Sequence, residues 1–121
     1  MKIGERSLTI KKLDVEFSKF IRNRDKRCVL CGKTENLQCG HLFSRVAHST
    51  RWSEVNCHGQ CSGCNVYHEH NPHKFTLWFI NRFGVDKYKL LFVQHNQTRK
   101  YTTGELQGML LYYKQQNGGK T

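Results

Sequence analysis

Acidic residues are scarce in this 121-residue chain: nine Asp and Glu stand against 20 Lys and Arg, which leaves a formal net charge of +11. This excess favours an anionic partner, and nucleic acid and acidic membrane surfaces are the usual ones. No run of apolar residues approaches the roughly 18 to 20 needed to cross a bilayer, which excludes a membrane-spanning helix. Residues 1–27 mix charges throughout and lack the apolar core of a secretory signal, so we expect no export.

Apolar residues are also few, at 37% of the chain, and the mean hydropathy is −0.70. A chain of this length is expected to form one domain, here with a small core. Aromatic residues, at 12%, and six cysteines argue against intrinsic disorder, because such a composition favours burial. We therefore expect a single α+β domain.

The positive charge is unevenly distributed along the chain. Residues 1–27 carry a net charge of +5 and residues 72–121 a net charge of +6, whereas residues 28–71 are neutral. The neutral segment contains all six cysteines and five of the seven histidines. The sequence thus predicts a basic N-terminal helix, a Cys/His-rich centre over 28–71 and a basic helical part over 72–121.

Apolar spacing predicts the elements of the first two parts. Residues 13–24 have the pattern of an amphipathic helix. Strands are expected over 37–43 and 54–60, followed by a helix that begins near Cys61 or Cys64.

Helices are also predicted for the C-terminal part. The only proline, Pro72, should end the preceding helix or open the next one, which is expected over 75–83 with Gly84 as its C-cap. Its aromatic residues are expected to be core and to pack against the N-terminal helix. A short helix over 86–93 and a last helix after the capping-box sequence 102–105 complete the prediction.

Two CxxC pairs are the strongest motif in the sequence, and their members are Cys28 with Cys31 and Cys61 with Cys64. Two intervening residues allow both sulfurs of a pair to bind one ion, so two such pairs suit tetrahedral zinc. The alternatives are disulfides, which suit exported proteins, a single redox pair, and buried free thiols. Zinc would hold the loop between the pairs rigidly. Cys39 and Cys57 are expected to be small buried hydrophobic residues.

Between and beside these pairs lie three residues suited to phosphodiester hydrolysis. His41 falls on the first expected strand, Asn56 on the second, and Asn65 at the start of the helix. A neutral imidazole can take a proton from water, and an amide oxygen is a suitable ligand for Mg²⁺. A second Asn, such as Asn56, can hold the loop between the strands by bonding its backbone groups.

The segments 17–25 (FSKFIRNRD), 38–45 (QCGHLFSR) and 60–65 (QCSGCN), together with Arg51-Trp52 and Asn56, resemble the lambdoid phage NinG (Rap) recombination nucleases. These are similar to HNH, or ββα-metal, endonucleases of the zinc-knuckle type. The resemblance covers residues 13–84. It implies a small zinc-stapled ββα-metal core flanked by N-terminal and C-terminal helices.

The resemblance also implies a role for each matched residue. His41 would be the general base, Asn56 the loop-fixing residue and Asn65 the ligand of a catalytic Mg²⁺ or Mn²⁺, while the four knuckle cysteines would hold structural Zn²⁺. Many HNH enzymes have a metal-binding Asp or His before the base, but here that position is Gly40, so metal binding should be weak. His68 and Glu69 share the helix face of Asn65 and could supply a second ligand.

Arginines near this site are expected to contact phosphate. Arg45 could brace the transition state as a catalytic residue or only position the phosphate. The residues expected to bind DNA are Lys19, Arg22, Arg24, Lys26, Arg27, Arg51, Lys87 and Lys89, acting mainly on phosphates.

The resemblance implies a phage enzyme in the host cytoplasm that cuts branched or single-stranded recombination DNA. Cutting both strands of a junction would favour a homodimer. The alternative is a noncatalytic zinc module that binds DNA or RNA. A third reading, a protein adaptor, is poorly served by a charge of +11.

Overall fold

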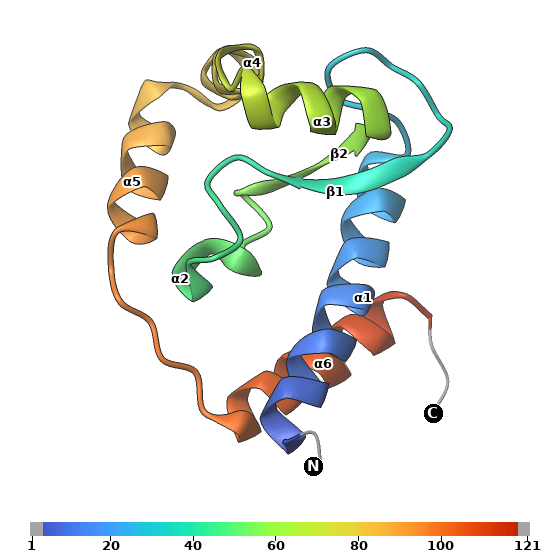
Figure 1. Ribbon diagram of the computed structural model, residues 1–121, viewed down its shortest axis with the longest axis vertical. Helices are drawn as coiled ribbons and strands as arrows, with labels where there is room; N and C mark the ends of the chain where they lie inside the picture. The colour runs from blue at the N-terminus through green and yellow to red at the C-terminus, as the bar shows by residue number, and fades with distance from the viewer. Residues whose placement is uncertain (1–3, 119–121) are drawn as a thin grey trace.

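A two-stranded antiparallel sheet lies between helices, which confirms a small mixed α+β domain (Figure 1). The computed structural model describes residues 4–118, apart from the side chains of Glu69 and His70. β1 (Leu37–His41) pairs with β2 (Cys57–Cys61), so that His41 lies opposite Cys57 and Gln38 opposite Gln60. No helix within residues 4–118 has the length and apolar character needed to cross a membrane.

The two faces of the sheet contact different helices, because successive side chains of a strand point to opposite sides. One face, with Cys39 and Cys57, packs against α1 (Glu5–Asp25). The other face carries Gln38, which bonds Asn65 of α3 (Ser62–His70). The sheet thus separates α1 from α3, and His41 lies at the end of β1 between them.

Both strands differ by a few residues from the expected ranges of 37–43 and 54–60. β1 ends at His41, although the backbone N–H of Leu42 still donates to the Asn56 carbonyl at 2.8 Å. The backbone N–H of Phe43 donates instead to the Asn56 side chain, and Leu42 enters a hydrophobic cluster. The loop that follows contains a four-residue helix, α2 (His48–Arg51), which was not predicted because four residues are too few to show a period.

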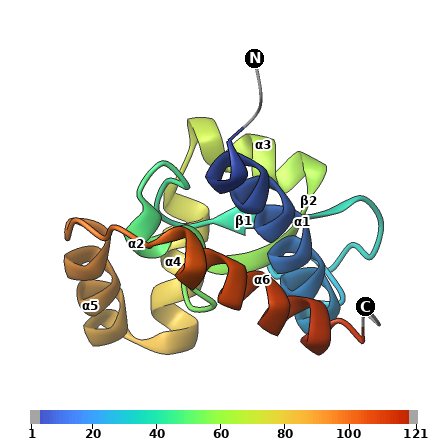
Figure 2. The same ribbon diagram turned by 90° about the horizontal axis from the view of Figure 1, so that it is seen from below.

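α1 begins eight residues earlier than its predicted start at residue 13. Thr9, Leu13, Phe17 and Ile21 are buried at intervals of four, as expected for one helix face. This face packs against α6 (Thr103–Gln116), which runs beside α1 (Figure 2). The capping box between Thr102 and Glu105 is confirmed. The two terminal helices therefore pack together, and α1 joins them to the sheet.

A second core lies among α4 (His73–Phe83), α5 (Val85–His95) and the loop after β1. Its buried members are Leu42, Phe75, Phe79 and Leu91. Pro72 is the N-cap of α4, and Gly84, with φ of 92°, ends that helix as predicted. Phe75 and Phe79 are core residues, but the prediction that they pack against the N-terminal helix is wrong. Their cluster contains no residue of α1, because α1 covers the other face of the sheet.

Candidate metal centre and catalytic cleft

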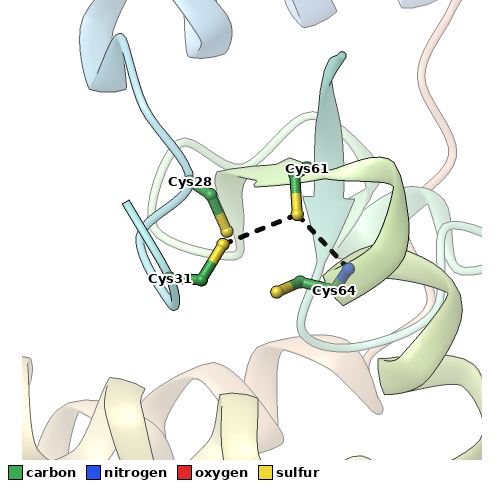
Figure 3. A group of neighbouring side chains, drawn as sticks. All are labelled: Cys28, Cys31, Cys61 and Cys64. Carbon is green, nitrogen blue, oxygen red and sulfur yellow. Dashed lines mark hydrogen bonds between the residues drawn. The ribbon is translucent and has the colours of Figure 1, made fainter. Parts of the chain in front are cut away.

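Four cysteine side chains converge where the turn after α1 meets the end of β2 and the start of α3 (Figure 3). Their sulfur atoms all lie within 4.8 Å of one another, and those of Cys31 and Cys61 are 3.6 Å apart. Four sulfurs about 2.3 Å from a tetrahedral zinc ion are about 3.8 Å apart, so the spacing fits such an ion. The cluster of Cys28, Cys31, Cys61 and Cys64 could therefore hold a structural metal ion such as zinc.

The pKa values of two of these thiols are shifted in opposite directions. Burial raises the pKa of the Cys28 thiol, but hydrogen bonds from nearby backbone groups outweigh it and lower that pKa to about 7. Burial and hydrogen bonds with the neighbouring sulfurs raise the pKa of Cys64 to about 12. Four adjacent thiolates repel one another, so full ionisation of the cluster needs a metal ion at its centre.

The cluster is anchored to the rest of the fold through the first CxxC turn. The backbone N–H of Val29 donates to the Gly59 carbonyl at 2.9 Å, which ties this turn to β2. Asp25, at the end of α1, accepts a bond of 2.6 Å from the backbone N–H of Gly59. Arg24 binds both the Asp25 carboxylate and the Cys57 carbonyl. The knuckle, α1 and β2 are thereby held as one unit.

Four of the predicted site residues line one cleft beside this unit. They come from β1, the following loop and α3, and they are His41, Arg45, Asn65 and His68. Cys39, Leu42, Ser44 and Pro72 complete the lining. The fold thus brings together residues that lie up to 27 positions apart in the sequence.

His41 is held in one orientation. Its Nε2 lies 2.8 Å from the backbone carbonyl oxygen of Arg51. A carbonyl oxygen only accepts, so the neutral ring carries its proton on Nε2 and keeps the Nδ1 lone pair as its basic atom. Burial lowers the pKa of His41 below its usual range, and the charges of Arg45 and Arg51 lower it further against the opposing bond to the carbonyl. The imidazole is therefore neutral near pH 7.

Asn56 is completely buried and bonds the backbone of the loop between the strands. Its Oδ1 accepts from the backbone N–H of Phe43 at 2.8 Å, and its Nδ2 donates to the carbonyls of Phe43 and Thr50, both at 3.0 Å. These bonds match the loop-fixing geometry expected from the sequence. Because Arg51 follows Thr50, they also position the carbonyl that holds His41.

Asn65 and His68 form the α3 side of the cleft. The Nδ2 of Asn65 donates to Oε1 of Gln38 at 2.8 Å. This bond uses the nitrogen of the amide and leaves its oxygen, Oδ1, available to a cation. His68 packs edge-on against Phe75, with ring centroids 4.9 Å apart. The side chain of Glu69, the other expected second ligand, lies outside the described residues.

The two arginines of the loop differ in their surroundings, and Asp14 of α1 explains why. Arg51 binds the Asp14 carboxylate through Nη2 at 2.5 Å and Nε at 3.0 Å, and its side chain is only 15% exposed. Arg45 makes one contact with the same carboxylate, at 3.1 Å, and is 60% exposed. Arg51 is therefore held by α1, whereas the more exposed Arg45 lines the cleft. The phosphate contacts expected of both arginines stay predictions.

The predicted DNA-binding residues differ in how many contacts they make within the protein and in how exposed they are. Arg24 was predicted to bind phosphate, but its Nη1 and Nη2 donate to the backbone carbonyls of Glu54 and Cys57, both at 2.8 Å. Lys19 contacts Glu16 at 3.4 Å and remains half exposed. Arg22 and Lys26 line a pocket on the α1 side of β1, and Arg22 also lines a pocket with His41. Arg27, Lys87 and Lys89 are exposed.

Sequence reasoning missed a second group of possible ligands around His41. The ligand atoms of Cys39, His41 and Cys57 lie within 4.8 Å of one another. Cys57 is fully buried, as predicted, and burial raises the pKa of its thiol. Cys39 is only half-buried and lines the cleft, which differs from the prediction. The alternation of Cys39 and His41 along a strand was the signal that could have revealed their shared face.

Comparison with known proteins adds to this geometry. A family model described as bacteriophage lambda NinG protein matches residues 1–118. A curated protein described as Protein ninG, from Salmonella phage P22, is 30% identical over 115 residues. That alignment covers 91% of this chain and 56% of the relative, so the chain spans a little over half of the relative's length. No solved structure matches the chain.

Proposed function

The chain belongs to the family of the bacteriophage lambda NinG protein, and from this membership and the cleft around His41 we propose that it is a metal-dependent DNA endonuclease with an HNH (ββα-metal) core. The observation that carries the proposal is the fixed imidazole of His41 in the same cleft as Asn65. A fixed tautomer matters for a general base, because it decides which nitrogen accepts the proton. A histidine that only binds phosphate does not require it.

In this mechanism Nδ1 of His41 accepts a proton from the attacking water, while its Nε2–H stays bonded to the Arg51 carbonyl. Asn65 would hold Mg²⁺ or Mn²⁺ through Oδ1, and His68 would be a second ligand. The bound cation would supply charge neutralisation at the scissile phosphate and the leaving oxygen. Arg45, exposed at the cleft, would bind a non-bridging phosphate oxygen.

Structural zinc in the four-cysteine cluster would keep this geometry rigid. The knuckle holds the end of β2 and the start of α3, and α3 carries Asn65. DNA would be bound mainly through its phosphates, with Arg22 and Lys26 on the α1 side of the cleft. Contacts of this kind select DNA shape, which suits branched or single-stranded recombination intermediates in the host cytoplasm. Cutting both strands of such a junction would suit a homodimer.

The test is cleavage of linear, single-stranded, flap and four-way DNA by the zinc-loaded protein, with and without Mg²⁺ or Mn²⁺. We expect cleavage only with the added metal, and we expect His41→Ala to lose at least about a hundredfold in rate while remaining folded and zinc-loaded. His73→Ala, at an exposed position of α4, is the matched control. Full activity of His41→Ala would refute the assignment of the general base.

A noncatalytic zinc module that binds DNA or RNA is the second candidate. It is favoured by the cysteine cluster and by the charge of +11, neither of which requires catalysis. The same assays separate the two: tight, salt-sensitive binding with no cleavage of any substrate under any metal would favour the module.

A further inference from the structure

The polar side chain of Gln60 is buried without hydrogen bonds to any described residue, which costs free energy of folding. Gln60, on β2, is 0% exposed. Neither its Nε2 nor its Oε1 has a hydrogen-bond partner within the described part of the chain. Buried amides are nearly always hydrogen-bonded, because an unpartnered one has lost its bonds to water without replacement. An apolar side chain of similar length would fill this position without that penalty.

Gly40 makes room for this amide. A Cβ at residue 40 would lie 2.3 Å from Oε1 of Gln60 and 2.6 Å from its Cδ, distances that atoms in van der Waals contact cannot adopt. The backbone of Gly40 does not lie in the left-handed region, so the glycine is required by space and not by conformation. The Gln60 amide thus occupies the volume in which a side chain of residue 40 would begin.

This volume lies behind the lining of the cleft, of which neither Gly40 nor Gln60 is a member. Gly40 precedes His41, and its two chain neighbours, Cys39 and His41, both line the cleft. Gln60 pairs across the sheet with Gln38, the residue that accepts the hydrogen bond from Asn65. The unpartnered amide therefore lies on the α3 face of the sheet. Its neighbours on β1 are Gly40, which precedes His41, and Gln38, which bonds Asn65.

We propose that Gln60 is a ligand of the catalytic divalent cation, with Oε1 serving beside Oδ1 of Asn65. The inference rests on the proposed function and identifies a metal ligand that the sequence pattern does not provide at residue 40. Amide oxygens are suitable ligands for Mg²⁺ and Mn²⁺. Because Oε1 has no hydrogen bond to give up, binding a cation there would satisfy the group instead of breaking an existing contact.

Two neutral amides bind a cation weakly. Mg²⁺ usually keeps several waters and takes further ligands from the phosphates of a substrate. The affinity for Mn²⁺ should therefore rise when DNA is present, since the scissile phosphate supplies the negative charge that Gln60 and Asn65 lack.

The experiment measures Mn²⁺ binding by the loss of the free-ion electron paramagnetic resonance signal, in the presence of a non-cleavable phosphorothioate DNA. In zinc-loaded Gln60→Met the dissociation constant for Mn²⁺ should rise about tenfold or more. Its melting temperature should equal or exceed that of the natural chain, because the unpartnered amide is gone. Gln115→Met, at an exposed position of α6, should leave both quantities unchanged. Gln60→Glu should tighten Mn²⁺ binding relative to Gln60→Met.

A Mn²⁺ dissociation constant for Gln60→Met within twofold of the natural value would overturn the inference. If the natural chain still cut DNA in that case, the proposed nuclease would stand and only the role of Gln60 would be wrong. A natural chain that neither binds Mn²⁺ nor cuts any DNA would overturn both. If Gln60→Met proves unstable, Gln60→Glu decides: binding weaker than that of the natural chain would also overturn the inference.

Discussion

The backbone carbonyl oxygen of Arg51 lies 2.8 Å from Nε2 of His41 and fixes which nitrogen of that imidazole is basic. The carbonyl is itself held in place by its neighbours, because Asn56 bonds the Thr50 carbonyl and Asp14 binds the Arg51 guanidinium. If His41 acts as the proposed general base, its position depends on Asn56 and Asp14 as well as on its own strand.

The pH dependence of cleavage should report the lowered pKa of His41. The base acts when neutral, so activity is retained above its pKa and lost as the pH falls through it. Burial and the nearby arginines lower that pKa, which places the acidic limb of kcat/KM below the ordinary histidine value of about 6.5. Initial rates between pH 5 and 8 at saturating metal measure this limb. A midpoint above 7 would show that His41 is not the titrating base.

Asn56→Ala should destabilise the fold. The change removes a fully buried amide that makes three hydrogen bonds to backbone groups, and those groups are left without partners. We expect a loss of about 2 to 4 kcal/mol in the free energy of unfolding, measured by urea denaturation. The control is Asn96→Ala, whose exposed amide bonds one carbonyl of its own helix and should change stability by less than about 0.5 kcal/mol.

Gly40→Ala should be destabilising by about 1 to 3 kcal/mol, because its Cβ would overlap the Gln60 amide. Adding Gln60→Ala removes the overlapping atoms, so the double variant should recover part of that loss in a double-mutant cycle. Gly63→Ala is the matched control: a Cβ there meets no atom within 4 Å, and Ala in place of Gly favours the helix. Additive effects of the two substitutions would contradict the close approach.

Removal of zinc should unfold the centre of the molecule. We expect one zinc per chain by elemental analysis, its loss on treatment with a strong chelator, and a cooperative loss of the sheet and of the stability that it provides. Cys31→Ser should purify without stoichiometric zinc, whereas Cys39→Ser, outside the four-cysteine cluster, should retain it. Equal zinc contents in the two variants would place the ion elsewhere.

Sequence reasoning succeeded where the signal was local. The CxxC pairs predicted a four-cysteine cluster, because two intervening residues allow two sulfurs to converge whatever surrounds them. The capping box at Thr102 was predicted for the same reason, since its bonds join residues three apart. Aromatic spacing likewise located α4.

Sequence reasoning did not identify side-chain partners that lie far apart in the chain. Arg51 and Arg24 were expected to bind phosphate, but Asp14 and the β2 backbone engage them. The early start of α1 depends on its contact with α6, nearly 100 residues away. No local pattern encodes such contacts, because they form only when distant segments pack.

By itself, the sequence determined the cysteine cluster, the order of the site residues and the concentration of positive charge outside the neutral centre. Only the tertiary structure decided which charges remain available, which nitrogen of His41 is basic, and that Gly40 gives its space to Gln60. The first group follows from residue types and their spacing along the chain, which the sequence contains directly. The second group depends on distances between atoms of β1, β2, α1 and the connecting loop, and the fold alone sets those distances.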